Sequence, residues 1–93
     1  MSSDTVAPYL LTDNITVRPR GDGQYDVVML FIDDLSAVKS GTISMTDGTL
    51  IHSFNGNVAT YRVKIPQVLD YKVTDAYGNV VSNKVDLTQY IVE

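Results

Sequence analysis

Few side chains in this sequence could perform chemistry, and they do not form a recognisable constellation. His52 is the only histidine and there is no cysteine, so the several nitrogen or sulfur ligands of a zinc site are not available. Ser53 and Asp47 are near His52 in the chain, but neither is on the sharp strand-to-helix turn that presents a serine nucleophile. We therefore predict no catalytic residue, no enzymatic activity, and a packed or half-buried structural role for His52.

Several acidic residues fall at expected strand ends and turns. They are Asp33, Asp34, Asp47, Asp70 and Asp75. Aspartate favours such places because its carboxylate hydrogen-bonds the local backbone. No segment has the ligand spacing of an EF-hand loop. The sequence therefore predicts neither a metal site nor a cofactor.

Length and composition indicate one small domain covering residues 1–93. Hydrophobic residues make up 44% and charged residues 19%, the balance of an ordinary globular protein. The net charge of −4 argues against nucleic-acid partners, because phosphate binding needs clustered Lys and Arg. No apolar run approaches the ~20 residues of a membrane span, and residues 1–5 lack the basic and apolar regions of a signal peptide. We expect no membrane contact and synthesis without export.

The elements that must position these side chains are strands almost throughout. Short runs of Val, Ile, Thr and Tyr are separated by Gly, Asn, Asp and Pro at intervals of roughly 8–12 residues, which is typical of a sandwich or barrel. The best helical candidate, 33–40, is one helical turn or a plain loop. The pattern predicts about seven strands. They are 9–18 with a kink near Asp13, 24–32, a hairpin around Asp47 and Gly48, 58–65, 69–74, and 80–92 with a bulge or strand end near Gln89.

Both faces of the segment 24–32 are apolar. One face carries Tyr25, Val27, Met29 and Phe31, and the other carries Val28, Leu30 and Ile32. This pattern predicts the central strand of a sheet. In a two-layer sandwich one face of each strand points outward. The second group is therefore either covered by another part of the chain or is a protein–protein interface.

The Asp47-Gly48 pair predicts a type I′ hairpin turn, because both residue types tolerate a positive φ. A two-residue loop would pair Thr46 with Thr49, Met45 with Leu50, and Ile43 with His52. These pairs would place five side chains on one face. They are Ile43, Met45, Leu50, His52 and Phe54.

The segment 69–79 resembles the sixth strand and following turn of bacterial immunoglobulin-like and PKD-like domains, in which Tyr-x-Val-x-Asp-x-x-Gly-Asn recurs. The resemblance implies an immunoglobulin-like Greek-key β-sandwich. It also implies that Tyr71 is a tyrosine-corner residue, buried and bonded to the backbone through its hydroxyl, two positions before Val73. The antibody cysteines and tryptophan are absent, so the resemblance is to the broad group. Another Greek-key sandwich or a small barrel is the alternative. Some immunoglobulin-like domains bind Ca²⁺ through aspartates in their loops, which is the alternative to the turn interpretation of the acidic residues.

A free-standing domain of this kind is similar to small phage virion proteins that decorate capsids, cement them or serve as tail accessories. This resemblance implies a non-enzymatic structural protein, made in the host cytoplasm, that binds a capsid or tail lattice and can form a homo-oligomer within the assembly. The candidate interface residues are Val28, Leu30, Ile32, Tyr77 and Tyr90.

The alternative function is a carbohydrate- or protein-binding module of a larger bacterial surface protein or glycoside hydrolase, located at the cell surface or secreted. Exposed aromatic side chains such as Tyr9, Tyr77 and Tyr90 would then stack on sugars if they were grouped at one end of the domain.

Two small basic spots are expected on this acidic protein. Arg18 and Arg20 flank Pro19, while Arg62 and Lys64 share one strand face. These residues form a solvated face or meet an acidic partner surface.

Overall fold

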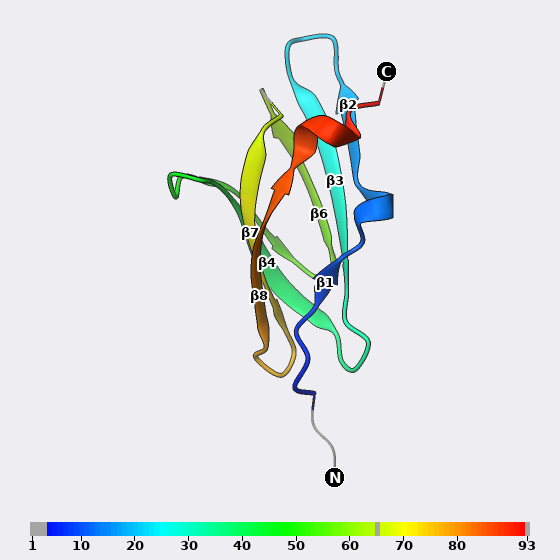
Figure 1. Cartoon of the computed structure of the whole chain (residues 1–93), viewed down its shortest axis with the longest axis vertical. Helices are drawn as coiled ribbons and strands as arrows, with labels where there is room; N and C mark the ends of the chain where they lie inside the picture. The colour runs from blue at the N-terminus through cyan, green and yellow to red at the C-terminus, as the bar shows by residue number, and fades with distance from the viewer. Residues whose placement is uncertain (1–3, 65, 93) are drawn as a thin grey trace.

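The computed structural model describes residues 4–64 and 66–92, and it is all-β, with two antiparallel sheets packed face to face (Figure 1). Ile65, which the sequence places at the end of a strand, is outside the described residues. The molecule is elongated, with extents of 52 × 26 × 19 Å. Within the described ranges there is no helix that is long and apolar enough to cross a membrane.

The first sheet is built around β3 (Tyr25–Ile32). This strand pairs with β6 (Val58–Val63) on one side and with β1 (Tyr9–Leu10) and β2 (Thr16–Pro19) on the other. The expected central position of this strand is therefore confirmed. The expected first strand is divided by a 3₁₀ turn, η1 (Thr12–Asn14), at the place where the sequence predicts a kink.

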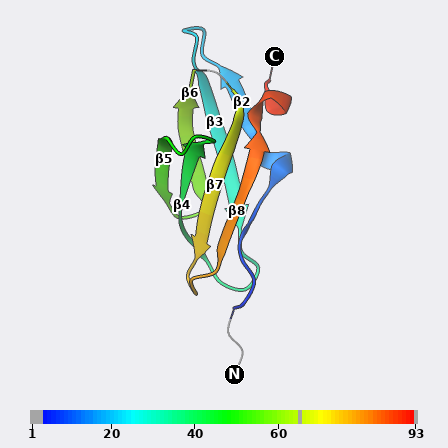
Figure 2. The same ribbon diagram turned by 60° about the vertical axis from the view of Figure 1, so that its left-hand side comes forward.

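The second sheet has the order β5-β4-β7-β8 (Figure 2). Its strands are β4 (Val38–Met45), β5 (Leu50–Asn55), β7 (Val68–Asp75) and β8 (Val80–Asp86). The segment 33–40 forms no helical turn: residues 33–37 form a loop, and residues 38–40 are the first residues of β4.

The last strand ends earlier than its sequence pattern suggests. The carboxylate of Asp86 accepts hydrogen bonds from the backbone N–H and the hydroxyl of Thr88, which starts the 3₁₀ turn η2 (Leu87–Tyr90). After this turn Ile91 forms a parallel bridge with Val17 of β2. The end of the chain therefore crosses to the first sheet.

The turn between β4 and β5 differs from the predicted type I′ turn. Met45 pairs with Thr49 around a three-residue loop, and only Gly48 in that loop has a positive φ, of 95°. Asp47 keeps a negative φ because its carboxylate accepts a hydrogen bond from the N–H of Thr49 at 2.9 Å. The predicted Thr46–Thr49 and Met45–Leu50 pairs are therefore wrong.

The hairpin also contains a bulge that changes its register. Ile43 pairs with His52 as expected, but Ser44 pairs with Leu50, so Ile51 has no partner opposite it. The bulge turns Leu50 into solvent, and Ile51 packs against the core in its place.

The core joins the two sheets through aromatic rings. Phe31 of β3 packs between Phe54 and Tyr71 of the second sheet, with ring centroids 5.6 Å and 5.5 Å apart. The ring of Phe54 lies over Gly41, where a Cβ atom would come within 2.5 Å of it. A glycine inside β4 therefore makes room for the contact between the sheets.

Candidate functional site

The outward-facing side of the first sheet carries a continuous apolar surface. Val28, Leu30 and Ile32 alternate with fully buried neighbours on β3 and are each half-buried. Strand register places Tyr9 opposite Ile32 and Val58 opposite Leu30. The surface made by these five side chains is called the outer apolar face. The prediction that Val28, Leu30 and Ile32 share the face of β3 opposite the core is confirmed.

Neighbouring strands border this face without closing it. Tyr9 keeps 42% of its surface exposed and Val58 keeps 43%. The hydroxyl of Tyr9 donates to Asp34 at 3.2 Å, which fixes the ring at one end of the face. The flanking strands therefore leave apolar surface in contact with solvent.

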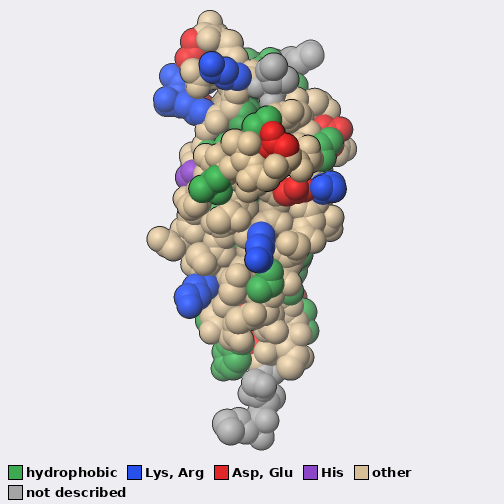
Figure 3. Space-filling view, turned by 90° about the vertical axis from the view of Figure 1, so that its left-hand side faces the viewer, with side chains coloured by type: hydrophobic (Ala, Val, Ile, Leu, Met, Phe, Trp, Pro, Cys, Tyr) green, Lys and Arg blue, Asp and Glu red, His purple; other side chains and the backbone are tan. Residues whose placement is uncertain are grey.

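The opposite end of the outer apolar face is basic. Four of the seven lysines and arginines lie at the end of β2, in the β2–β3 turn and at the end of β6. They are Arg18, Arg20, Arg62 and Lys64. The carboxylate of Asp26 accepts a hydrogen bond from the guanidinium of Arg62 at 3.1 Å, and it lies 3.6 Å from the guanidinium of Arg20. Basic side chains gather at this end of the molecule in Figure 3.

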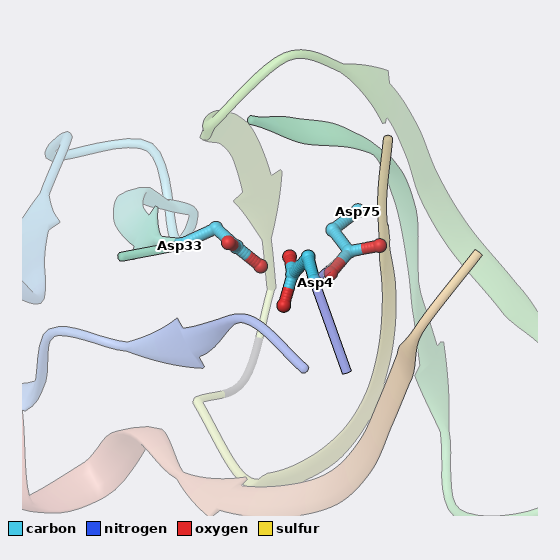
Figure 4. Close-up of side chains that lie close together, drawn as sticks. All are labelled: Asp4, Asp33 and Asp75. Carbon is cyan, nitrogen blue, oxygen red and sulfur yellow. The ribbon is translucent and has the colours of Figure 1, made fainter. Parts of the chain in front are cut away.

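A second group of side chains, which the sequence analysis did not assemble, lies at the end of the sandwich near the N-terminus. Asp4 precedes β1, Asp33 follows β3, and Asp75 ends β7. One carboxylate oxygen from each residue lies within 4.8 Å of those from the other two, and Asp4 lies between Asp33 and Asp75 (Figure 4). Asp4 is only 7% exposed and Asp75 is completely buried. These three residues are called the carboxylate cluster.

The β7–β8 turn positions Asp75. Its three-residue loop has Gly78 at a φ of 86°, and the N–H of Asp75 bonds to Asn79. The Asp75 carboxylate accepts hydrogen bonds from the backbone N–H groups of Tyr77 and Asn79 and from the amide side chain of Asn79, all at 2.9 Å. The same Asn79 amide donates to the carbonyl of Asp4 at 3.0 Å. Asn79 therefore joins the segment before β1 to the turn.

The loop after β3 positions Asp33. Its Oδ1 accepts the N–H groups of Leu35 and Ser36, a local turn that orients the carboxylate. The hydroxyl of Ser36 donates to Asp4 at 2.7 Å, and the N–H of Val6 donates to the other oxygen of Asp4. The second oxygen of Asp33, Oδ2, is buried and has no partner among the described residues.

Hydrogen bonds and burial move the pKa values of two cluster members in opposite directions. The bond from Ser36 lowers the pKa of Asp4, but desolvation and the neighbouring carboxyls outweigh it, so this pKa lies above the ordinary value of 3.8. Desolvation raises the pKa of Asp75, but bonds from Asn79 and Asp4 outweigh it and hold the pKa far below that value. Asp4 therefore holds a proton more readily than an ordinary aspartate, and Asp75 holds one less readily.

The remaining predicted residues are dispersed. Tyr77 is exposed in the β7–β8 turn, and Tyr90 is half-buried in η2 against the core, at the opposite end of β8. His52 is half-buried and stacks on Phe54 and Tyr61, as expected of a structural residue. Tyr77 and Tyr90 therefore do not form a surface together.

Tyr71 is buried as predicted and packs on Phe31. No hydrogen bond joins its hydroxyl to another described residue, so the tyrosine-corner bond is not found in the described part of the chain.

Asp4 is the site residue that sequence reasoning missed. Asp33 and Asp75 were recognised as acidic residues at strand ends, but Asp4 lies outside every strand pattern. Its contacts with Ser36 and Asn79 join residues 32 and 75 positions apart, and no local pattern encodes such distances.

Comparisons with protein-family models, with curated proteins and with solved structures each found no match.

Proposed function

We propose that this chain is a non-enzymatic binding module with an immunoglobulin-like Greek-key topology, and that it attaches to a protein partner through its outer apolar face. The strand order supports the topology. Strands β1, β2, β3 and β6 form one sheet and β4, β5, β7 and β8 form the other, so the chain passes between the sheets three times from β1 to β8. Immunoglobulin-like domains distribute their A, B and E strands and their C, F and G strands in this way.

The observation that carries the binding proposal is the outer apolar face itself. A contiguous apolar surface with a polar rim marks an interaction site on many proteins. Val28, Leu30 and Ile32 form its centre, and Tyr9 and Val58 extend it across both neighbouring strands. An aromatic side chain at the edge of an aliphatic patch suits a protein interface, in which aromatic residues are enriched.

The basic residues at one end of the outer apolar face indicate which charge the partner surface would carry. The basic end of the face contrasts with the net charge of −4 of the whole chain. A partner with an apolar centre and an acidic border on one side would match both the apolar residues and Arg18, Arg20, Arg62 and Lys64. The specific form of this proposal is a virion subunit that binds a capsid or tail lattice, as the family resemblance implies.

The carbohydrate-binding alternative is less well supported. A sugar platform needs aromatic rings on one surface, but Tyr77 and Tyr90 lie at opposite ends of β8 and Tyr90 packs on the core. Of the three aromatic side chains that the alternative names, Tyr90 is therefore separated from Tyr77, and only Tyr9 and Tyr77 are exposed.

Two neighbouring residues of β3 test whether the outer face is free. Leu30 is half-buried on the outer side, whereas Met29 is completely buried on the inner side. We expect Leu30→Asp to lower the melting temperature by less than about 8 °C, and Met29→Asp to prevent folding, because it buries an unpaired charge. Circular dichroism melts of the two variants provide the measurement. Unfolding of Leu30→Asp without a partner would show that the face is covered within the chain, and the proposed interface would be wrong.

The partner is then identified with a photo-crosslinking amino acid at position 30, and at the exposed position 53 of the second sheet as the control. A protein captured at position 30 but not at position 53 is purified, and its affinity is measured by calorimetry. Leu30 is already half-buried, so binding gains only part of the roughly 1.5–3 kcal/mol of complete leucine burial. The aspartate of Leu30→Asp adds the cost of burying an unpaired charge in the interface, so we expect this variant to weaken binding at least about tenfold. Equal affinity of the variant and the parent protein would refute the outer-face proposal.

A further inference from the structure

We propose that the free edge of β6 pairs with an extended segment of the protein partner, which adds a strand to the first sheet and carries a carboxylate opposite Arg62. This inference rests on the proposed function, because the added strand would continue the outer apolar face beyond Val58. β6 lies at the outer edge of its sheet, with β3 on its inner side and no described strand paired with it on the other (Figure 2).

The backbone of β6 holds polar groups that its own sheet does not use. The N–H of Phe31 bonds to the carbonyl of Asn57, which makes these two residues a hydrogen-bonded pair of the β3–β6 ladder. Such pairs recur at every second position of an antiparallel ladder. The N–H and C=O groups of Val58, Thr60 and Arg62 therefore point away from β3, and no described residue bonds to them. A row of unpaired backbone groups is a template for another strand.

The other sheet edges are protected, whereas the edge of β6 is not. On β2, the carbonyl of Val17 is already bonded to the end of the chain, and Pro19 has no N–H. On β8, the N–H of Lys84 bonds to the side chain of Asn83, and a bulge at Ile51 interrupts β5. Proline, bulges and covered edges are devices that prevent strand pairing. β6 has none of these three devices and keeps an unbroken register with β3, so it is the edge that can accept a strand.

There is room for a strand beside β6. A hollow of about 630 Å³ lies along this edge, with Thr60, Tyr61 and Arg62 on one side and Ile51 and His52 of β5 on the other. β5 belongs to the second sheet and does not pair with β6. An added strand can therefore bond to β6 and place alternate side chains in the hollow, against the stacked rings of His52 and Tyr61.

The side chains of β6 specify the segment. Alternate residues of this strand are exposed on the outer side of the sheet, and they are Val58, Thr60 and Arg62. Antiparallel pairing, which is slightly more stable per residue than parallel pairing, would place positions 1, 3 and 5 of a segment opposite Arg62, Thr60 and Val58 in that order. The side chain of Arg62 is 61% exposed and shares Asp26 with Arg20, so an acidic residue suits position 1. Apolar residues suit position 5, beside Val58, and positions 2 and 4, which face the hollow.

A second copy of this chain fits the edge less well. Two β6 strands paired about Thr60 would set Arg62 opposite Val58 and would bring no carboxylate to the arginine. A partner segment with an acidic residue brings one, and it also matches the basic end of the outer apolar face.

The test uses the full chain and a capped synthetic peptide, Ser-Gly-Asp-Val-Thr-Val-Leu-Gly-Ser, whose central five residues occupy positions 1 to 5. We expect the amide resonances of β6 to shift during titration to about 2 mM peptide, which detects millimolar dissociation constants. We also expect hydrogen exchange of the amides of Val58, Thr60 and Arg62 to slow. Absence of both changes would overturn the proposal.

Methylation of single peptide amides distinguishes backbone pairing from contact through side chains. The N–H at position 3 would point toward β6, whereas the N–H at position 4 would point away from it. We expect N-methylation at position 3 to weaken binding at least about tenfold, and N-methylation at position 4 to change it by less than about threefold. Equal effects at the two positions would contradict strand addition.

Two variants test the same bond from the side of the protein. Thr60→Pro removes an N–H that does not belong to the β3–β6 ladder, so we expect a folded protein whose affinity for the peptide falls at least about tenfold. Thr60→Val keeps the N–H and removes only the hydroxyl, and we expect an affinity within about threefold of the parent. Equal peptide affinities of Thr60→Pro and the parent protein would contradict the assigned edge. The methylated peptides carry the test if Thr60→Pro does not fold.

Two further measurements separate this proposal from its alternatives. A dimer of the parent chain in sedimentation, dissociated by Thr60→Pro, would show that a second copy occupies the edge and would contradict the partner segment. Leu30 lies two strand spacings, about 10 Å, from the added strand, so we expect Leu30→Asp to bind the peptide as the parent does. Failure of the peptide to bind would leave the outer apolar face standing. Peptide binding, together with an unchanged partner affinity of Leu30→Asp, would refute that face and leave the edge.

Discussion

At the scale of single residues, the pKa values of Asp4 and Asp75 are shifted in opposite directions. The raised pKa of Asp4 means that the protonated side chain favours the folded state. This contribution is lost as the pH rises from 3.8, the pKa of Asp4 in the unfolded chain, through the raised pKa of Asp4 in the folded protein. The lowered pKa of Asp75 means that its ionised side chain favours the folded state. This contribution is lost as the pH falls below 3.8, the pKa of an ordinary aspartate, toward the lowered pKa of Asp75.

Asp4→Asn tests this balance. We expect the variant to gain stability relative to the parent protein between about pH 4 and about pH 7, because an amide cannot ionise beside Asp33 and Asp75.

Urea unfolding of the variant and the parent protein at about pH 4 and at about pH 7 measures this difference. Asp47→Asn is the control. Hydrogen bonds from Thr49 lower the pKa of Asp47, so this residue changes the pH dependence of stability only below about pH 3.8. A stability difference between Asp4→Asn and the parent that does not change with pH would argue against the proton on Asp4.

At the scale of the elements, local pattern predicts strands well and their ends poorly. Period-two alternation identified β3, β6 and β7, because each buries one face against the other sheet. The early end of β8 depends on a side chain of Asp86 that caps the next turn, and the bulge in β5 depends on which of two apolar residues reaches the core. Such choices are made by packing between the sheets, and a single-strand pattern does not contain them.

The β4–β5 turn gives a prediction at this scale. Gly48 has a φ of 95°, which a β-branched side chain resists, so we expect Gly48→Val to lower the free energy of unfolding by about 1–2 kcal/mol or more. Thr46→Val adds the same side chain in the same exposed loop at a position without positive φ, and we expect a change within about 0.5 kcal/mol. Urea unfolding compares the two variants. Equal effects would mean that the loop does not hold Gly48 in the left-handed conformation.

At the scale of the whole molecule, one contact between the two sheets depends on a glycine in β4. Gly41 has no Cβ, so the ring of Phe54 can lie over β4 and stack on Phe31 of the opposite sheet. The sequence pattern indicated strands and faces, but this contact joins three strands and was not predictable from any one of them. The carboxylate cluster has the same character, since it also joins three separate segments.

Gly41→Ala tests the contact. The new methyl group would meet Phe54 at 2.5 Å and Val73 at 2.9 Å, so we expect a loss of about 1–3 kcal/mol in the free energy of unfolding. Phe54→Leu removes the ring atoms that clash, and the two changes together should cost less than the sum of the single changes. Additive losses in urea unfolding would show that Gly41 and Phe54 are not in contact.

The pairing of Ile91 with Val17 bears on how the domain would respond to mechanical load. The described ends of the chain lie at opposite ends of the long axis (Figure 1), and the N–H of Val92 bonds to Val17 where the two segments run parallel. Tension applied between these ends would slide the two segments past each other and would not peel them apart. At the N-terminal end of the molecule, the first contacts to carry tension would be the hydrogen bonds that Ser36 and Asn79 make with Asp4.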